Sequence, residues 1–284
     1  MEQLKKPDWL KRKISGDELA DADATRALID GLRVETVCRE ADCPNYAECF
    51  SRGTATFMIL GVNCTRNCAF CNVTHGEPAA VDDGEPVRVA EAVARLGLKY
   101  VVITSVTRDD LLDGGAGHFA AVISEIRRHS PATEIETLIP DFGGSPDALC
   151  TVAEAAPDVI SHNMETVREL YGEVRPEAIY ERSLELIKRV SGLPATRSKS
   201  GFMVGLGETA AQVHKLMDDL RGADCEFLTI GQYLAPSSAH HPVVEYVAPE
   251  TFDAYAETAR AKGFAFVASA PFVRSSYRAE EALR

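Results

Sequence analysis

The chain has 284 residues, of which 45% are hydrophobic and 26% charged, a composition that excludes an intrinsically disordered protein. Its formal net charge of −13 excludes nonspecific nucleic-acid binding, because the phosphate backbone would repel so acidic a chain. No apolar run reaches the roughly 18 residues of a membrane-spanning helix, and the polar start shows no signal peptide, so we expect a cytoplasmic protein without a membrane partner.

Residues 1–53 do not share the pattern of the rest of the chain. They hold one short amphipathic segment and three cysteines, with too little apolar sequence for a core of their own, so we expect an N-terminal extension. Its start is basic although the chain as a whole is acidic, with five positively charged residues: Lys5, Lys6, Lys11, Arg12 and Lys13. They form either a solvated tail or a patch that docks an acidic carrier domain.

Seven apolar, β-rich runs follow, and helical patterns lie between them. The runs begin at Thr54, Tyr100, Glu134, Pro157, Ser200, Glu226 and Phe264. After the second run, apolar residues recur at i, i+3, i+4 and i+7 from Phe119 to Ile126, which indicates one buried helix face. A later helix begins with the capping-box pattern of Thr209 and Gln212. Strands alternating with helices predict a parallel sheet with right-handed crossovers.

Six such units fit an α/β fold of the partial (β/α)6 TIM-type barrel kind over residues 54–270, with residues 271–284 as a C-terminal tail. A doubly wound open sheet is the alternative. We favour the barrel because chemically active residues follow several different strands, and barrel enzymes build their sites at the C-terminal ends of their strands.

Three cysteines follow the first predicted strand in the spacing C-x3-C-x2-C: Cys64, Cys68 and Cys71. A short loop can wrap three thiolates around one face of a cubane iron–sulfur cluster, and one iron then stays open for a substrate. Structural zinc is the alternative, with Cys150 or Cys225 as a distant fourth ligand. Both of these cysteines also suit the role of small buried hydrophobes.

The spacing, the position after a first strand and the aromatic Phe70 between the last two cysteines resemble the radical S-adenosylmethionine (SAM) superfamily. The resemblance implies a [4Fe-4S] cluster on Cys64, Cys68 and Cys71, with SAM chelating the open iron. Reductive cleavage of SAM would give a 5′-deoxyadenosyl radical that abstracts hydrogen from an unactivated carbon, and Phe70 would lie against the adenine.

An upstream trio, Cys38, Cys43 and Cys49, has the spacing C-x4-C-x5-C, a weak pattern by itself. Together with "SVTRDDLLDGGAGHF", "HNMETVRELY", "VRPEAIYERSLELIKR" and the terminal "RSSY", it makes nearly the whole chain similar to the lipoyl synthase family. The resemblance implies an auxiliary [4Fe-4S] cluster on this trio that serves as sulfur donor. Its fourth ligand would be Ser276, with Ser275 as the alternative, and an oxygen ligand is more easily released than a thiolate.

Polar residues that follow the predicted strands are candidates for SAM contacts. Asn163 and Glu165 suit the ribose hydroxyls and the amino group, and Ser105 could reach the methionyl part. Arg175 or Arg182 could pair with the SAM carboxylate. Each of them also suits a structural role, since strand-end Ser, Asn and Glu commonly cap the next helix, and we expect Glu165 to begin one.

Two adjacent histidines, His240 and His241, follow the sixth run, and we expect them to be exposed in a loop. The resemblance implies sulfur insertion at C6 and C8 of an octanoyl chain on a carrier-protein lysine. The carrier would be an E2 lipoyl domain of a 2-oxoacid dehydrogenase or the glycine cleavage H protein. An electron donor such as ferredoxin or flavodoxin, an iron–sulfur carrier and a monomeric state are also implied. Alternatives are another two-cluster radical SAM enzyme and a non-catalytic iron–sulfur carrier or zinc-stabilised scaffold.

Overall fold

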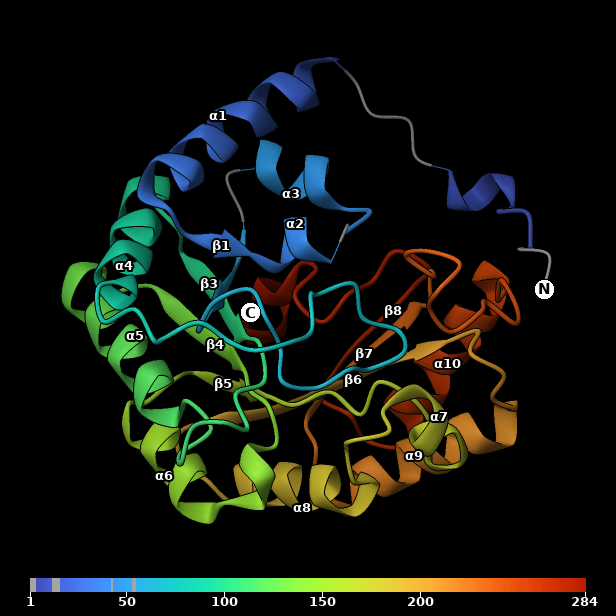
Figure 1. Ribbon diagram of the computed structural model, residues 1–284. Coiled ribbons are helices and arrows are strands. Elements are labelled where there is room, and N and C mark those ends of the chain that lie inside the picture. The colour runs from blue at the N-terminus through green and yellow to red at the C-terminus, as the bar shows by residue number, and fades with distance from the viewer. Residues whose placement is uncertain (1–3, 12–15, 42, 53–54) are drawn as a thin grey trace. The chain divides into compact units, whose positions relative to one another are not determined.

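Strands and helices alternate along the chain (Figure 1). The computed structural model describes residues 4–11, 16–41, 43–52 and 55–284, without the side chains of residues 16–19 and 21. The chain divides into an amino-terminal unit, Lys13–Arg66 with Asn72–Ile160, and a carboxyl-terminal unit, Met1–Arg12 with Asn67–Cys71 and Ser161–Arg284. Arg12 and Lys13 of the basic start lie outside the described residues.

In the described part of the amino-terminal unit, the strands β1 to β4 pair in order. β1 (Glu35–Thr36), which the sequence did not predict, runs antiparallel to β2 (Thr56–Ile59). β2, β3 (Tyr100–Ser105) and β4 (Glu134–Leu138) are parallel. The helices of this unit are α1 (Gly16–Leu32), α2 (Val37–Glu40), α3 (Tyr46–Ser51), α4 (Glu85–Leu96), α5 (Ala116–His129), η2 (Phe142–Gly144) and α6 (Pro146–Glu154).

Three parallel strands pair in the carboxyl-terminal unit: β6 (Arg197–Val204), β7 (Phe227–Gln232) and β8 (Phe266–Ser269). The short strand β5 (Val159–Ser161) contains the division between the units. The helices here are η1 (Asp8–Leu10), η3 (Arg168–Leu170), α7 (Tyr171–Val174), α8 (Tyr180–Ser191), α9 (Ala210–Gly222), α10 (Pro249–Ala261) and η4 (Ala279–Leu283).

The hydrogen-bonded order of the strands is β1 to β8, the same as their order in the chain. A doubly wound open sheet instead reverses its strand order at a switch point. The predicted partial-barrel arrangement of parallel strands and crossover helices is therefore confirmed, and the doubly wound alternative is wrong. None of the described helices is long and apolar enough to cross a membrane.

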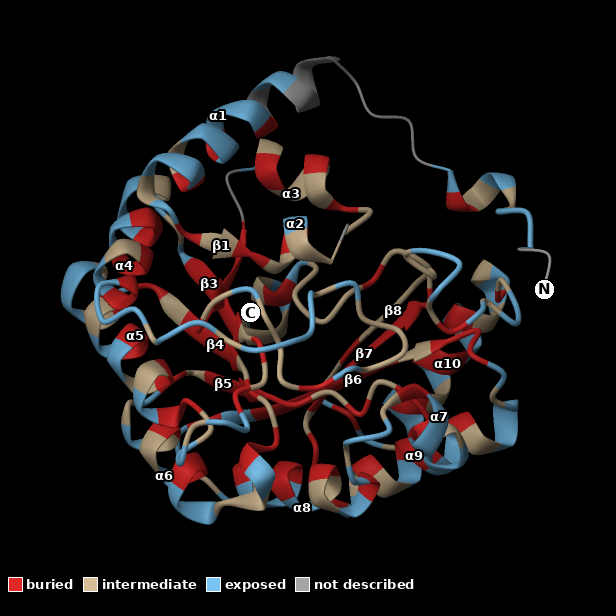
Figure 2. Cartoon of the chain, viewed as in Figure 1, coloured by how far each residue is buried: buried red, intermediate tan, exposed pale blue. Residues whose placement is uncertain are grey.

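Most residues of the parallel strands are buried and appear red in Figure 2, except in β8, where only Val267 is buried. Every residue of β2 and of β7 is buried. Strands covered on both faces read as continuous apolar runs in the sequence, which is why these segments were recognisable. The helices bury only one side; in α5 the predicted apolar face from Phe119 to Ile126 is fully buried. The capping box of Thr209 and Gln212 starts α9 as predicted.

Candidate active site

The chain turns sharply where β2 ends and the first cysteine loop begins. Leu60 and Gly61 both have left-handed backbone conformations, with φ of 69° and 91°. The N–H of Leu60 donates to Glu85 Oε2 (2.9 Å), and its carbonyl accepts from Arg108 Nη1 (3.2 Å). A left-handed conformation is strained in a leucine. The hydrogen bonds to the N–H and to the carbonyl of Leu60 are therefore needed to hold the turn.

Cys64 is fixed by its backbone and its sulfur. Its N–H donates to the carbonyl of Thr74 (2.8 Å), and its carbonyl accepts from the N–H of Gly76 (3.0 Å). Its Sγ accepts from the backbone N–H groups of Thr107 (3.3 Å) and Arg66 (3.5 Å). Donors aimed at a sulfur stabilise a thiolate and tune the potential of an iron–sulfur cluster bound to it, so this environment fits a cluster ligand.

Arg66, inside the cysteine motif, joins the loop to the ends of two strands. Its Nε and Nη2 donate to both oxygens of Asp109 (2.6 and 2.8 Å), and Nη2 also reaches Asp141 Oδ1 (2.7 Å). Burial lowers the pKa of Arg66, but the two carboxylates outweigh that effect and raise it above its usual value. Residues that follow β3 and β4 therefore meet at the C-terminal ends of these strands, where the barrel prediction expects a site, whereas the role of Arg66 was not foreseen.

The segment from Asn67 to Cys71 belongs to the carboxyl-terminal unit. The ring of Phe70 packs against Val174, Leu206 and Tyr233. The N–H of Ala69 donates to the carbonyl of Val174 (2.9 Å). Phe70 is thus held by an apolar cluster at one side of the motif.

The loop after β7 lies along this segment. The N–H of His241 donates to the carbonyl of Ala69 (2.8 Å), and His240 Nε2 lies 3.1 Å from the carbonyl oxygen of Cys71. The predicted exposure of the histidines is wrong for His241, which is buried, with Nε2 3.1 Å from Glu173 Oε1. Its burial follows from these contacts between segments far apart in the sequence. The two histidines therefore brace the backbone that carries Cys68 and Cys71.

The upstream cysteines lie on and between two short helices of the amino-terminal unit. Cys38 is in α2, Cys49 is in α3, and the N–H of Cys43 donates to the carbonyl of Cys38 (3.1 Å). Burial raises the pKa of the Cys38 thiol to about 11, and the nearby Cys43 sulfur adds to the shift. Cys38 is buried, whereas Cys43 and Cys49 are half-buried. Neighbouring thiolates of this kind need a soft cation to compensate their charge, so this donor set fits an iron–sulfur cluster or zinc.

No group of three or more His, Cys, Asp or Glu side chains in the described part of the chain has an arrangement ready to hold a metal ion. The two cysteine trios therefore stay predictions as ligand sets. Cys225 is buried, as predicted, but Cys150 is exposed on α6, so its expected place among the buried hydrophobes is wrong.

Glu165 sits in a strand-like position. It bridges to Phe202 of β6, its N–H donates to the carbonyl of Gly201 (3.1 Å), and its carbonyl accepts from the N–H of Met203 (2.8 Å). Its φ is 65°. The expected helix start at Glu165 is therefore wrong, because the next helix, η3, begins only at Arg168. The backbone pairing aims its side chain independently of any helix.

Three of the candidate SAM residues come together here. Asn163 Nδ2 donates to Glu165 Oε1 (3.0 Å), and Arg175 Nη1 donates to the carbonyl of Asn163 (2.8 Å). Burial raises the pKa of Glu165, while Arg175, Asn163 and Arg274 oppose the rise. The buried Asn163 Oδ1 has no hydrogen-bond partner among the described residues. A buried acceptor of this kind fits a ligand hydroxyl.

The other two candidates lie elsewhere in the fold. Ser105 ends β3 in the amino-terminal unit, and its buried Oγ lacks a hydrogen-bond partner within the described residues. Arg182 is a half-buried residue of α8. In the tail, Ser275 and Ser276 are both half-buried, so their exposure does not distinguish them as ligands.

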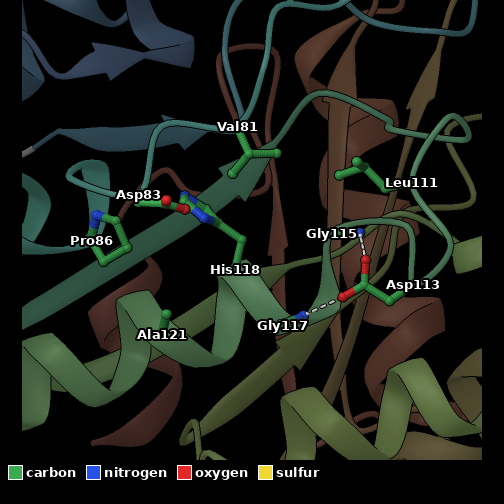
Figure 3. A pocket seen from close by; sticks show the side chains of 9 residues that line it. All are labelled: Val81, Asp83, Pro86, Leu111, Asp113, Gly115, Gly117, His118 and Ala121. Carbon is green, nitrogen blue, oxygen red and sulfur yellow. Dashed lines mark hydrogen bonds between the residues drawn. The ribbon is translucent and has the colours of Figure 1, made fainter.

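A pocket of about 360 Å³ lies in the amino-terminal unit (Figure 3). Figure 3 shows Asp113 accepting from the N–H groups of Gly115 (2.9 Å) and Gly117 (2.8 Å), at the start of α5. His118 Nε2 lies 2.7 Å from Glu85 Oε2, the oxygen that also holds the turn at Leu60. The pocket is therefore connected to the cysteine loop through one shared carboxylate.

Comparisons with known proteins show what the whole chain is similar to. Residues 58–220 match the family model of the Radical SAM superfamily. A lipoyl synthase of Alkaliphilus metalliredigens (strain QYMF) is 54% identical over 280 residues, covering 98% of this chain and 96% of the relative. A lipoyl synthase of Geobacter sulfurreducens is 55% identical over 276 residues, covering 97% of this chain and 90% of the relative.

Solved structures share the fold at low sequence identity. The crystal structure of methylornithine synthase (PylB) aligns with a TM-score of 0.55 at 12% identity, over 90% of this chain and 84% of that one. The crystal structure of HydG, a maturase of the [FeFe]-hydrogenase, aligns with a TM-score of 0.58 at 14% identity, over 88% of this chain and 61% of that one.

Proposed function

Because the chain belongs to the lipoyl synthase family of the radical SAM superfamily, we propose that it inserts two sulfur atoms, at C6 and C8, into an octanoyl chain on a protein lysine. The observation that carries this function is the identity of about 54% with lipoyl synthases over nearly the full length of both chains. An alkyl C–H bond offers no acid–base route, so the reaction needs radical chemistry that a cofactor supplies.

Cys64, Cys68 and Cys71 hold the cluster that reduces SAM in this proposal. When bound, that [4Fe-4S] cluster supplies the electron that cleaves SAM to the hydrogen-abstracting radical. The N–H groups of Thr107 and Arg66 on Cys64 Sγ support its role as a thiolate ligand. Closed structural zinc would need a fourth protein ligand, whereas three cysteines leave a coordination position for SAM.

The residues grouped around Glu165 bind SAM in this proposal. The buried acceptor of Asn163 and the carboxylate of Glu165 suit the ribose hydroxyls and the amino group. Arg175, or Arg182 on α8, pairs with the SAM carboxylate. Ser105 reaches the methionyl part, and its buried hydroxyl, without a partner in the described chain, supports that assignment.

Phe70 has the adenine contact in this proposal. Its anchoring against Val174, Leu206 and Tyr233 supports a fixed ring that a planar base could lie against. The neighbouring backbone, braced by His241, keeps the ring and the adjacent cysteines in one orientation.

Cys38, Cys43 and Cys49 hold the auxiliary [4Fe-4S] cluster, and Ser276 is its fourth ligand, with Ser275 as the alternative. A sulfur donor must come apart during turnover, and an oxygen ligand is released more easily than a fourth thiolate. The raised pKa of Cys38 supports this assignment, because a buried thiol with a sulfur neighbour is deprotonated only when a cation compensates it.

The partners follow from the reaction. The octanoylated carrier is an E2 lipoyl domain of a 2-oxoacid dehydrogenase or the glycine cleavage H protein, and it docks on the basic start of the chain. Lys5, Lys6 and Lys11 are exposed there, which supports contact with an acidic domain. Ferredoxin or flavodoxin supplies electrons, an iron–sulfur carrier rebuilds the auxiliary cluster, and the enzyme works as a cytoplasmic monomer.

Anaerobic assays of cysteine variants test the function. The wild-type protein should bind about eight irons per chain, four for each cluster. With SAM, a reductant and an octanoylated peptide, it should release 5′-deoxyadenosine and a dithiolated peptide. Cys64→Ala should abolish both products, whereas Cys38→Ala should still release 5′-deoxyadenosine but no thiolated peptide. Deoxyadenosine without any thiolated product from the wild type would instead favour another two-cluster radical SAM enzyme. If the purified protein is colourless and binds zinc instead of iron, the alternative of a non-catalytic, zinc-stabilised scaffold is favoured.

A further inference from the structure

The tail that carries the RSSY motif begins as a continuation of the sheet. After β8 ends at Ser269, the N–H of Ala270 donates to the carbonyl of Ile230 (3.2 Å), and the carbonyl of Pro271 accepts from the N–H of Gln232 (3.3 Å). Ile230 and Gln232 are the two neighbours of one residue of β7, Gly231. The first tail residues are therefore bonded to β7 on either side of that glycine.

Gly231 leaves the space into which the tail folds. A Cβ placed on it would lie 2.1 Å from the carbonyl oxygen of Val273, 3.2 Å from its carbonyl carbon and 3.3 Å from Arg274 Nη1. Cβ atoms do not approach backbone atoms within 3.0 Å, so the tail backbone would have to move. Gly231 needs no unusual φ, because it pairs with Met203 in the regular ladder between β6 and β7. The glycine is thus required for close approach and not for chain flexibility.

Arg274 fastens the tail at the same point. Its Nη1 donates to the carbonyls of Val273 (2.7 Å) and Pro271 (3.4 Å). Its charge acts on the buried carboxylate of Glu165, which also faces Arg175 and accepts from Asn163. The charges of Arg274 and Arg175 therefore both act on one buried carboxylate, while the bonds of Arg274 to the carbonyls of Val273 and Pro271 hold its side chain against the tail backbone.

We propose that Gly231 and Arg274 are positioning residues that form a seat for the tail and so fix where the serines of the motif lie. The seat is a property of the carboxyl-terminal unit alone. Its consequence for the auxiliary cluster rests on the proposed function, in which Ser276 or Ser275 is an iron ligand. The seat holds the first tail residues, and the two serines follow it directly, one and two positions beyond Arg274, inside the turn that the N–H of Tyr277 closes on the carbonyl of Arg274.

Hydrogen exchange tests the seat without reference to activity. In the reconstituted full-length protein, Gly231→Ala should speed exchange of the amides of Val273 and Tyr277, which donate to Ala270 and Arg274 carbonyls, by at least about tenfold. The matched control is Gly222→Ala at the end of α9, where an added Cβ meets nothing within 4 Å. Equal exchange in the Gly231 and Gly222 variants would overturn the proposal.

A second variant keeps the proposal testable if Gly231→Ala does not fold. Arg274→Gln adds no volume beside β7 but removes the charge, so it should speed exchange of the same amides. Arg274→Lys keeps the charge and should restore most of the protection. If Arg274→Gln leaves tail exchange at the wild-type rate, Arg274 is no part of the seat.

Mössbauer spectra of the same samples separate the seat from the proposed function. Gly231→Ala should lose the iron site with an oxygen ligand, while the SAM-dependent change in the spectrum of the other cluster persists. A loosened tail with an unchanged auxiliary cluster would confirm the seat and contradict serine ligation. An unchanged tail would contradict the seat whatever the cluster does.

Discussion

Arg66, which lies between two cysteines of the motif, also stabilises the fold through two ion pairs. Its side chain is 8% exposed, and it neutralises Asp141, which is 1% exposed, and Asp109. Removing one partner of a buried ion pair leaves an uncompensated charge, a loss of about 3–5 kcal/mol. Arg66→Met should lower the free energy of unfolding by that order and reduce the iron bound after reconstitution. Denaturant unfolding of the apo protein measures the first effect.

The matched control for Arg66 is Arg95→Met on the exposed side of α4, where the partner Glu91 is also exposed. An exposed pair contributes at most about 1 kcal/mol, so this variant should unfold like the wild type. An equal decrease in the free energy of unfolding in both variants would show that Arg66 does not hold the loop.

Glu165 should make stability depend on pH. Burial raises its folded-state pKa, so the folded protein binds this proton more tightly than the unfolded chain. The stability is therefore lost as pH rises from the ordinary glutamate value through the raised one. Glu165→Gln should gain stability relative to the wild type across that window, as measured by denaturant unfolding of the apo protein.

Glu181→Gln on α8 controls for this pH effect. The pKa of Glu181 is lowered by a backbone hydrogen bond and by Arg168, so its replacement should never gain stability with rising pH. A pH-independent difference between Glu165→Gln and the wild type would contradict a buried, raised-pKa carboxyl group.

At the scale of elements, the turn between β2 and the cysteine loop depends on Glu85 of α4. Glu85→Ala leaves the buried N–H of Leu60 without an acceptor, a cost of about 1–3 kcal/mol, and takes away the partner of His118. Glu85→Gln keeps an acceptor and should recover most of that loss. The free energy of unfolding and the rate of iron release at fixed chelator concentration both measure the effect.

Glu91→Ala, also on α4 but exposed, should change stability by less than about 0.5 kcal/mol. If Glu85→Ala and Glu91→Ala have the same free energy of unfolding and the same rate of iron release, the carboxylate of Glu85 does not hold the turn.

Local patterns predicted the elements well, and long-range contacts account for what was missed. The buried face of α5 and the capping box of α9 depend on neighbours three or four residues apart, which a sequence displays directly. β1 has only two residues, too few for any periodicity. The bridge of Glu165 to β6 and the burial of His241 depend on contacts between segments far apart in the sequence, so no local pattern could predict them.

At the scale of the whole molecule, charge is unevenly distributed. The chain carries a formal net charge of −13, yet Lys5 and Lys6 are exposed together near its start. Lys5→Glu with Lys6→Glu should lower kcat/KM for an octanoylated acidic carrier domain about tenfold at low salt, because complementary charges steer encounter. The loss should shrink at high salt, where the Debye length is short.

A double control, Lys188→Glu with Lys215→Glu on α8 and α9, makes the same change in net charge at other exposed positions. It should leave kcat/KM for the carrier nearly unchanged. A short octanoylated peptide should react equally with both double variants. A docking role for the basic start is refuted if the two double variants lose carrier turnover to the same degree.

The most direct test of the account is the origin of the inserted sulfur. The protein is reconstituted with heavy-isotope sulfide, freed of unbound sulfide, and incubated anaerobically with SAM, a reductant and an octanoylated peptide. Mass spectrometry of the product should show two heavy sulfur atoms per lipoyl group, and Cys38→Ala should give no thiolated product. Product carrying light sulfur, or 5′-deoxyadenosine released with the peptide unchanged, would contradict sulfur insertion from a cluster on Cys38, Cys43 and Cys49.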